Sequence, residues 1–185
     1  MVSSSRSRLA TMDYTDLPVS ECLLGGDAEM LTFVLDRARK EFAWKTGGLD
    51  RTQLRRRHPP STMTLAGLIK HSALVEDRFT AIAQGRTPVQ PTTDDVSEWE
   101  SALRDEPDTL YAMWFGAVER SRLAWTDMTA HGGLDAVVAD PDPAWTKNRR
   151  RVLVDLIEET LIHLGHVDLL REATDGRRGH GWPEP

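Results

Sequence analysis

A carboxylate and two imidazoles lie close together near the end of the chain, in the stretch EETLIHLGHVDLLRE at residues 158–172. Glu159 and His163 are four residues apart, and His166 follows three residues later. In an α-helix, a spacing of three or four residues brings two side chains to the same face, with Cβ atoms about 5–6 Å apart. A Glu and a His placed in this way can chelate one divalent ion together, and zinc accepts both ligand types.

The same helical face also carries apolar residues, which indicates that it points into a core. These residues are Val152, Leu156, Val167 and Leu170. An ionised carboxylate in a core costs several kcal/mol unless it is paired or coordinates a metal. Metal chelation and a buried Glu–His ion pair would each compensate Glu159, and the spacing alone does not separate these two interpretations.

A third ligand is expected from another helix, because catalytic zinc sites usually combine three protein groups with an open position. His71 is the best candidate, since it lies beside the apolar stripe of a predicted helix over residues 63–85. A single His near an apolar face is, however, more often a hydrogen-bonded core residue than a ligand. The sequence therefore proposes His71, Glu159 and His163 as metal ligands, with His71 resting on the weakest pattern.

Two further residues are candidates for catalysis. His166 could bind metal together with His163 or contact a ligand from outside, and we favour the second role. Asp155 lies one turn before Glu159 and could orient a metal-bound imidazole or face solvent. We predict that His166 and Asp155 move protons or orient ligands.

Four amphipathic patterns with start and stop signals must position these residues. Asp27 is a plausible N-cap for the first, Pro107 suits the first turn of the third, and Gly85 and Gly176 are stop signals for the second and fourth. The predicted helices span residues 27–46, 63–85, 107–128 and 147–176. Residues 86–106 carry three of their hydrophobic side chains singly and predict a long crossover that includes one short turn, and residues 131–145 break the third helix. The fold class is therefore all-α, a four-helix bundle with long crossover connections.

The composition limits the location and the partners of the protein. With 185 residues, 39% hydrophobic residues and 28% charged residues, the chain fits one globular domain, which we place at 13–176 between a disordered tail at 1–12 and a C-terminal tail at 177–185. A net charge of −6 would repel a phosphate backbone, so no nucleic acid partner is expected. We expect no membrane span and, without a secretory h-region, a cytoplasmic location. Cys22, the single cysteine, is predicted to be an inert packing or surface residue.

Two long blocks of the sequence resemble the actinobacterial, mini-circle-protein branch of the DinB superfamily, whose members are often called mycothiol transferases. The blocks are FAWKTGGLDRTQLRRRHPPSTMTLAGLIKHSALVEDRF at 42–79 and VLVDLIEETLIHLGHVDLLREATDG at 152–176. The resemblance implies a DinB/YfiT-like four-helix bundle with one divalent metal, commonly zinc or nickel. It implies His71, Glu159 and His163 as the ligands, and this Glu-containing set is similar to that of mycothiol-dependent maleylpyruvate isomerase. Asp155 departs from the pattern, because this branch often has His there.

From the resemblance we expect a metal-dependent thiol transferase with one zinc ion per chain, or nickel in its place. The ion would activate a low-molecular-weight thiol, mycothiol by analogy, to conjugate or isomerise a small electrophile. The segments 86–106 and 131–146 would shape the electrophile pocket, and the protein is expected to be a homodimer. The alternative is a non-catalytic, stress-associated dimeric bundle that binds metal. A di-iron carboxylate bundle would need two Glu-x-x-His motifs and two further carboxylates, a set that this sequence lacks.

Overall fold

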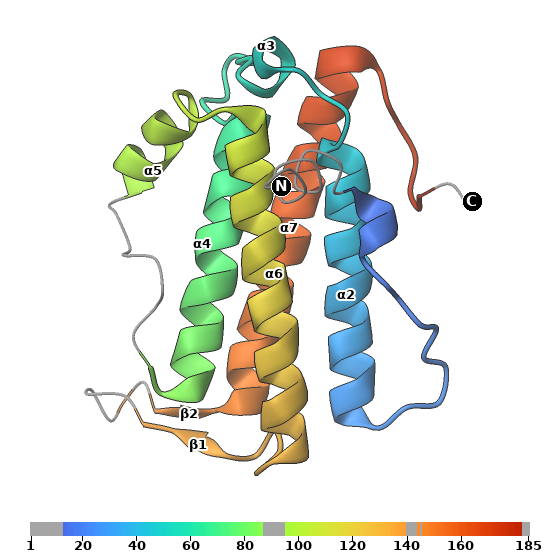
Figure 1. The fold of residues 1–185 in the computed structure, drawn as a ribbon, viewed down its shortest axis with the longest axis vertical. Helices are drawn as coiled ribbons and strands as arrows, with labels where there is room; N and C mark the ends of the chain where they lie inside the picture. Colours follow the sequence, from blue (N-terminus) through green and yellow to red (C-terminus); the bar gives the residue numbers. More distant parts are fainter. Residues whose placement is uncertain (1–12, 87–94, 140–143, 145, 183–185) are drawn as a thin grey trace, which may run out of the picture.

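The computed structural model describes residues 13–86, 95–139, 144 and 146–182. Long helices dominate it, which confirms the all-α prediction (Figure 1). The elements in chain order are η1 (Tyr14–Asp16), α2 (Asp27–Thr46), α3 (Arg51–Leu54), α4 (Leu65–Gln84), α5 (Asp95–Ala102), α6 (Pro107–Ala130), β1 (Val137–Val138), β2 (Lys147–Asn148) and α7 (Arg149–Asp175). The four predicted helices thus correspond to α2, α4, α6 and α7. The expected tail at 1–12 lies outside the described residues.

The four long helices form a bundle in which α2 and α7 run in one direction and α4 and α6 in the other (Figure 1). Helix α4 packs against both α6 and α7, and α7 also packs against α2. Helices α2 and α6 touch each other least among these neighbouring pairs. Because α4 and α6 are parallel neighbours, the chain must return along the length of the bundle between them. The predicted crossover at 86–106 connects these two helices, and its described part contains α5.

Capping explains where the helices begin and end. Thr64 accepts a hydrogen bond from the backbone N–H of Gly67 at the start of α4, and Gly85 ends that helix in a left-handed conformation with φ of 65°. Gly176 ends α7 in the same way, with φ of 82°. Both glycine stop signals are therefore confirmed. At α2 the N-cap is Gly26 and not Asp27, because the Glu29 carboxylate already accepts from the Gly26 N–H.

Two connections differ from the sequence prediction. The crossover contains the eight-residue helix α5, which is longer than the single turn that we expected. Residues predicted to break α6 include the short strand β1, which pairs antiparallel with β2, with Val137 opposite Asn148 and Val138 opposite Lys147. Strands of two residues are too short to produce the alternating pattern by which a strand is recognised in a sequence.

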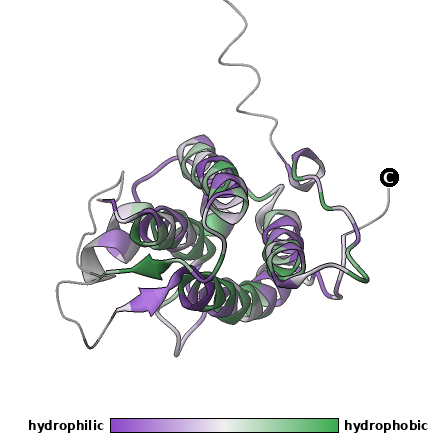
Figure 2. Cartoon of the chain, turned by 90° about the horizontal axis from the view of Figure 1, so that it is seen from below, coloured by the Kyte–Doolittle hydropathy of each residue, from purple (hydrophilic) through white to green (hydrophobic). Residues whose placement is uncertain are grey.

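The interior of the bundle consists of two hydrophobic clusters at different heights. One includes Phe42, Leu68 and Trp114, and the other includes Leu35, Trp125 and Leu156. Seen along the bundle, hydrophobic residues of the long helices turn toward the common centre and hydrophilic residues turn outward (Figure 2). Val152, Leu156, Val167 and Leu170 of α7 are all buried, so the prediction that this face points inward is confirmed.

A layer of buried polar side chains separates the two clusters at mid-height. Arg39 of α2 donates to the Glu76 carboxylate of α4 through Nε at 2.7 Å and Nη2 at 2.5 Å, and both side chains are only 3% exposed. The same Nη2 donates to Ser121 Oγ of α6 at 2.7 Å. Burial lowers the pKa of Arg39, but the charges and hydrogen bonds of Glu76 and Asp36 together outweigh burial and raise it. Three helices are thereby joined through one buried cation, which we call the Arg39 network.

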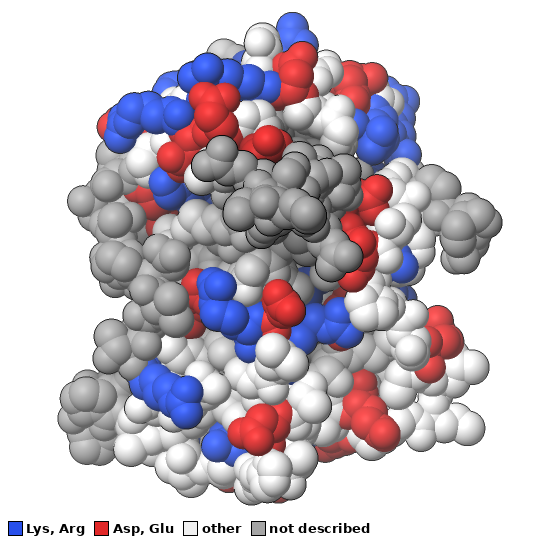
Figure 3. Space-filling model, in the orientation of Figure 1, with Lys and Arg blue, Asp and Glu red and all other residues white. Residues whose placement is uncertain are grey.

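Charges on the surface are mixed. On the face drawn in Figure 3, Lys and Arg side chains alternate with Asp and Glu, with no broad region of one sign. No helix among the described residues is long and apolar enough to cross a membrane. The described part of the C-terminal tail lies against α2, where Arg177 donates to the Trp44 carbonyl at 3.1 Å and Lys40 lies 4.9 Å from the Trp182 ring centroid.

The Arg39 network predicts a large loss of stability for Glu76→Gln, because Glu76 is the buried carboxylate that Arg39 contacts through two nitrogen atoms. The remaining counter-charge would be Asp36, which lies 2.9 Å from Nη1 and is 22% exposed. Because Asp36 still compensates part of the charge, we expect a loss of about 3 kcal/mol in the free energy of unfolding, at the lower end of the range for a broken buried ion pair, measured by urea denaturation. Glu106→Gln is the matched control, because Glu106 pairs with Arg51 at 3.1 Å where the two side chains are 56% and 54% exposed. That pair should contribute about 0–1 kcal/mol. Equal losses in the two variants would contradict this account.

Candidate metal centre

The three predicted ligands meet between α4 and α7, next to the Arg39 network. His71 comes from the N-terminal half of α4, whereas Glu159 and His163 are one turn apart on α7. One ligand atom from each residue can be chosen so that all three lie within 4.8 Å of one another. The grouping follows from the antiparallel packing of two helices whose apolar faces bury the neighbouring positions on either side.

The distances between these atoms are compatible with one shared ion. Glu159 Oε2 lies 3.3 Å from His163 Nε2 and 3.9 Å from His71 Nε2. Three ligands at the usual zinc distances would be roughly 3.4 Å apart in tetrahedral geometry. His71 Nε2 is buried and has no hydrogen-bond partner in the described chain. Since a buried ring nitrogen is normally satisfied, this atom fits the requirement for a metal ligand.

The exposure of the three ligands leaves the site open on one side. The side chains of His71 and His163 are 15% and 13% exposed, whereas that of Glu159 is 36% exposed. Glu159 is thus less buried than the apolar stripe of α7 implied, so its desolvation cost is smaller than a full core position would impose. Exposure on the Glu159 side also leaves a direction from which a further ligand could approach.

The other ring nitrogen of His71 is held by Glu98 of α5. The Glu98 carboxylate, 7% exposed, accepts a short hydrogen bond from His71 Nδ1. We assign the proton to Nδ1 because a carboxylate can only accept, and this tautomer leaves the lone pair of Nε2 free to bind an ion. A ligand histidine whose second nitrogen donates to a carboxylate is the usual arrangement in zinc proteins.

Trp99, the next residue of α5, covers the His71 ring from one side. The two rings are stacked, with centroids 5.3 Å apart and an interplanar angle of 20°. The indole also lies directly on Gly67, one turn before His71, where an added Cβ would be only 2.2 Å from Trp99 Cε3. Gly67 therefore leaves the space that lets α5 approach α4.

His166 lies next to His163 on α7 and is not one of the three grouped residues. Its Nδ1 is 3.4 Å from His163 Nδ1. If His163 uses Nε2 toward the centre, its Nδ1 carries the proton and donates to His166. The role of His166 outside the ligand set stays a prediction. Burial lowers the pKa of His163 to about 4, and the charge of His71 acts in the same direction while Glu159 opposes it. His163 is therefore neutral at pH 7, as a metal ligand must be.

Asp155 lies one turn before Glu159 on α7, and its carboxylate is engaged by cations. Lys147 Nζ lies 3.2 Å from Oδ2, and Arg151 Nε lies 2.6 Å from Oδ1. Asp155 therefore anchors the start of α7 to β2, and its described ion pairs do not include the three grouped residues.

Sequence reasoning missed Glu98 and Trp99. A signal was present, because Val96, Trp99 and Leu103 follow at helical spacings of three and four. The pattern is too short to identify a helix with assurance, and nothing in it indicates that Glu98 would reach a residue 27 positions away.

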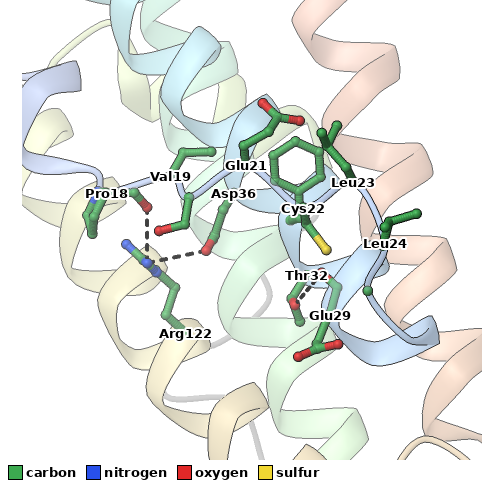
Figure 4. Close-up of a pocket in the computed structure, with 13 residues that line it drawn as sticks. Pro18, Val19, Glu21, Cys22, Leu23, Leu24, Glu29, Thr32, Asp36 and Arg122 are labelled. Atoms are coloured by element: carbon green, nitrogen blue, oxygen red, sulfur yellow. Dashed lines mark hydrogen bonds and ion pairs between the residues drawn. The ribbon is translucent and has the colours of Figure 1, made fainter.

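A separate pocket of about 580 Å³ lies between the segment 18–25 and helices α2 and α6 (Figure 4). Arg122 bridges it, donating to the Pro18 carbonyl at 3.2 Å and pairing with Asp36 at 3.3 Å. Cys22 lines this pocket, whereas the three candidate ligands do not. Cys22 is therefore not a component of the candidate metal centre.

Comparisons with known proteins assign the chain to a family. The family model described as Mycothiol-S-transferase matches residues 30–176. This range contains all four long helices apart from the first three residues of α2, together with the candidate metal centre. The chain belongs to the mycothiol-S-transferase family, a DinB-like family, as the resemblance in the sequence predicted.

A solved structure supports the fold. The chain is similar to a conserved protein from Enterococcus faecalis, with a TM-score of 0.67 and 16% sequence identity over 83% of this chain and 100% of the other. At this identity the similarity establishes the shared bundle fold alone. No curated protein matches the chain significantly.

A Gly→Ala substitution inside a helix normally raises stability, but the contact between Gly67 and Trp99 predicts that Gly67→Ala lowers it. Gly67→Ala should destabilise the protein by about 1–3 kcal/mol, because the clash with the indole exceeds the helix propensity gained. The control is Gly165→Ala on α7, where an added Cβ meets nothing within 4 Å and a gain of about 1 kcal/mol is expected. Thermal unfolding monitored by circular dichroism measures both, and a stabilised Gly67→Ala would show that Trp99 does not rest there.

Proposed function

We propose that this protein is a metal-dependent thiol transferase that conjugates or isomerises a small electrophile. The observation that carries the proposal is His71 Nε2, a buried nitrogen without a hydrogen-bond partner among described residues, 3.9 Å from Glu159. Membership of the mycothiol-S-transferase family supports a transferase with a thiol partner. The proposal adds the ion, its ligands and the thiol mycothiol.

His71, Glu159 and His163 would hold one divalent ion, zinc in the first place and nickel as an alternative. The two imidazoles and the carboxylate leave room for a further ligand, which distinguishes a catalytic zinc site from a closed structural one. When bound, a divalent ion supplies the positive charge that keeps a thiol in its thiolate form at neutral pH. Glu159 offsets part of that charge, and its exposed side marks the direction of substrate entry.

The thiol proton must leave before sulfur can attack. His166 is the candidate acceptor, because it lies beside His163 at the edge of the site. Its Nδ1 would take the proton after giving up the hydrogen bond from His163 Nδ1. Sulfur then donates an electron pair to carbon and forms an S–C bond. With a chlorinated electrophile the C–Cl pair leaves as chloride, and with a quinone the ring takes up the pair and a proton.

Asp155 is proposed to act less directly. Its ion pairs with Lys147 and Arg151 fix the first turn of α7, and through that helix they determine where Glu159 stands. A change at Asp155 would therefore affect the rate or its pH dependence while leaving the ligands in place.

The first prediction of the proposal is that one divalent ion binds per chain. His71→Ala and His163→Ala should each abolish binding, whereas His131→Ala should not, because His131 is 78% exposed beyond the end of α6. Elemental analysis and titration calorimetry give the stoichiometry. Free metal at about one hundred times its dissociation constant should stabilise the wild type by about 3 kcal/mol. Unchanged metal content in His163→Ala would exclude this site.

The second prediction is catalysis. Holo protein incubated with mycothiol and a chlorinated or quinone electrophile should form a thiol adduct, followed by mass spectrometry. His71→Ala should lose turnover while it keeps its helical circular dichroism, and His131→Ala should retain it. Turnover undiminished by His71→Ala would contradict the mechanism.

The alternative function is a non-catalytic, stress-associated dimeric bundle that binds metal. Leu161, Ile162 and Leu169 favour it, because these large apolar side chains of α7 are exposed and exposed apolar patches mark interaction surfaces. Absence of turnover with any thiol, in a chain that binds metal and sediments as a homodimer, would favour this alternative. The homodimer itself stays a prediction under both functions.

A further inference from the structure

Glu98 and Trp99 lie outside the predicted ligand set, yet both contact the candidate ligand His71. They belong to α5, which forms part of the crossover between α4 and α6 and lies beside the N-terminal half of α4 (Figure 1). Crossover segments are usually mobile and exposed. Glu98, in contrast, is a buried carboxylate, and such a group needs a specific compensating partner.

The only described side chain that Glu98 pairs with is His71. The short hydrogen bond joins the carboxylate to Nδ1, and the same imidazole is stacked by the indole of Trp99. One contact fixes the tautomer, and the other restricts rotation of the ring. Together they aim the lone pair of Nε2 toward Glu159 and His163.

The docking of α5 is built from several contacts that do not involve the metal ligands. Trp99 rests on the bare backbone of Gly67, and Lys70 Nζ pairs with Asp105 Oδ2 at 2.6 Å just beyond α5. Arg55 donates to the Asp105 carbonyl at 2.9 Å. The position of Glu98 is thus set by the fold and does not depend on His71 alone.

We propose that Glu98 is a positioning residue of the metal centre, which orients His71 and raises the electron density on its Nε2 through a charged hydrogen bond. The inference rests on the proposed metal site. It adds that the crossover helix α5 determines the affinity of that site and the ligand field at the ion, through a residue that does not touch the ion. Replacing the carboxylate by a neutral acceptor keeps the shape of the contact and removes the charge.

The test compares two isosteric changes on the same helix. Glu98→Gln removes the charge from the contact with His71, whereas Glu100→Gln makes the same chemical change at an exposed position one residue beyond Trp99. Zinc affinity is measured by competition with a chromophoric chelator, and the ligand field is measured from the visible absorption of the cobalt(II)-substituted protein. We expect Glu98→Gln to weaken zinc binding by about 10- to 100-fold and to shift the cobalt bands, with Glu100→Gln unchanged in both.

Each outcome has one meaning. Wild-type affinity and wild-type cobalt bands in Glu98→Gln would overturn the positioning role, even if the variant melted at a lower temperature. Failure of the wild type to bind zinc or cobalt would instead overturn the proposed metal site. If Glu98→Gln does not fold, Glu98→Asp replaces it, because this variant keeps the charge but withdraws the oxygens by one methylene. Unchanged affinity and bands in Glu98→Asp would likewise count against the positioning role.

Discussion

The bundle depends on the pairing of every charge that it buries at mid-height. Two hydrophobic clusters fill its two ends, and between them the four helices place polar side chains where a uniform core would have leucines. An unpaired charge in such a layer costs more than most single packing contacts contribute. The register of the helices is therefore constrained, since sliding one helix by a turn would separate Arg39 from Glu76 and His71 from Glu159.

The polar layer has two parts with different consequences. In the Arg39 network, the guanidinium is enclosed and donates hydrogen bonds to two carboxylates, Glu76 and Asp36, and to the Ser121 hydroxyl, which leaves it no free capacity for chemistry. In the candidate metal centre, the partners are incomplete, because His71 Nε2 lacks a partner among the described residues and Glu159 is partly exposed. The two parts share the walls of a small void lined by Arg39, Glu76, Glu159 and His163. The Arg39 network, whose hydrogen bonds are complete, thus lies beside the candidate metal centre, whose hydrogen bonds are not. The rigid network helps to hold the residues of the metal centre in place.

The crossover between α4 and α6 also supplies two residues that contact the candidate metal centre. Parallel neighbours α4 and α6 require a chain segment that travels the length of the bundle, and this segment carries Glu98 and Trp99 to the outer side of His71. The second histidine of the centre has its own neighbour, since His163 contacts His166 on the same helix. The second ring nitrogen is therefore contacted in both histidines. For His71 the partner is the Glu98 carboxylate from the crossover, and for His163 it is His166 on the same helix.

The sequence by itself determined the features that arise from local periodicity. The inward face of α7, the spacing of Glu159 and His163, and the glycine stops at 85 and 176 follow from 3.6 residues per turn and from the conformational freedom of glycine. The location of His71 on a second helix was visible, but its approach to Glu159 was not, because that distance depends on how α4 and α7 pack. Only the tertiary structure decided that Arg39 pairs with Glu76, that Asp155 is occupied by Lys147 and Arg151, and that Glu98 reaches His71. These are contacts between elements whose partners are chosen by packing across the bundle, and a one-dimensional pattern carries no information on which of many charged residues will meet.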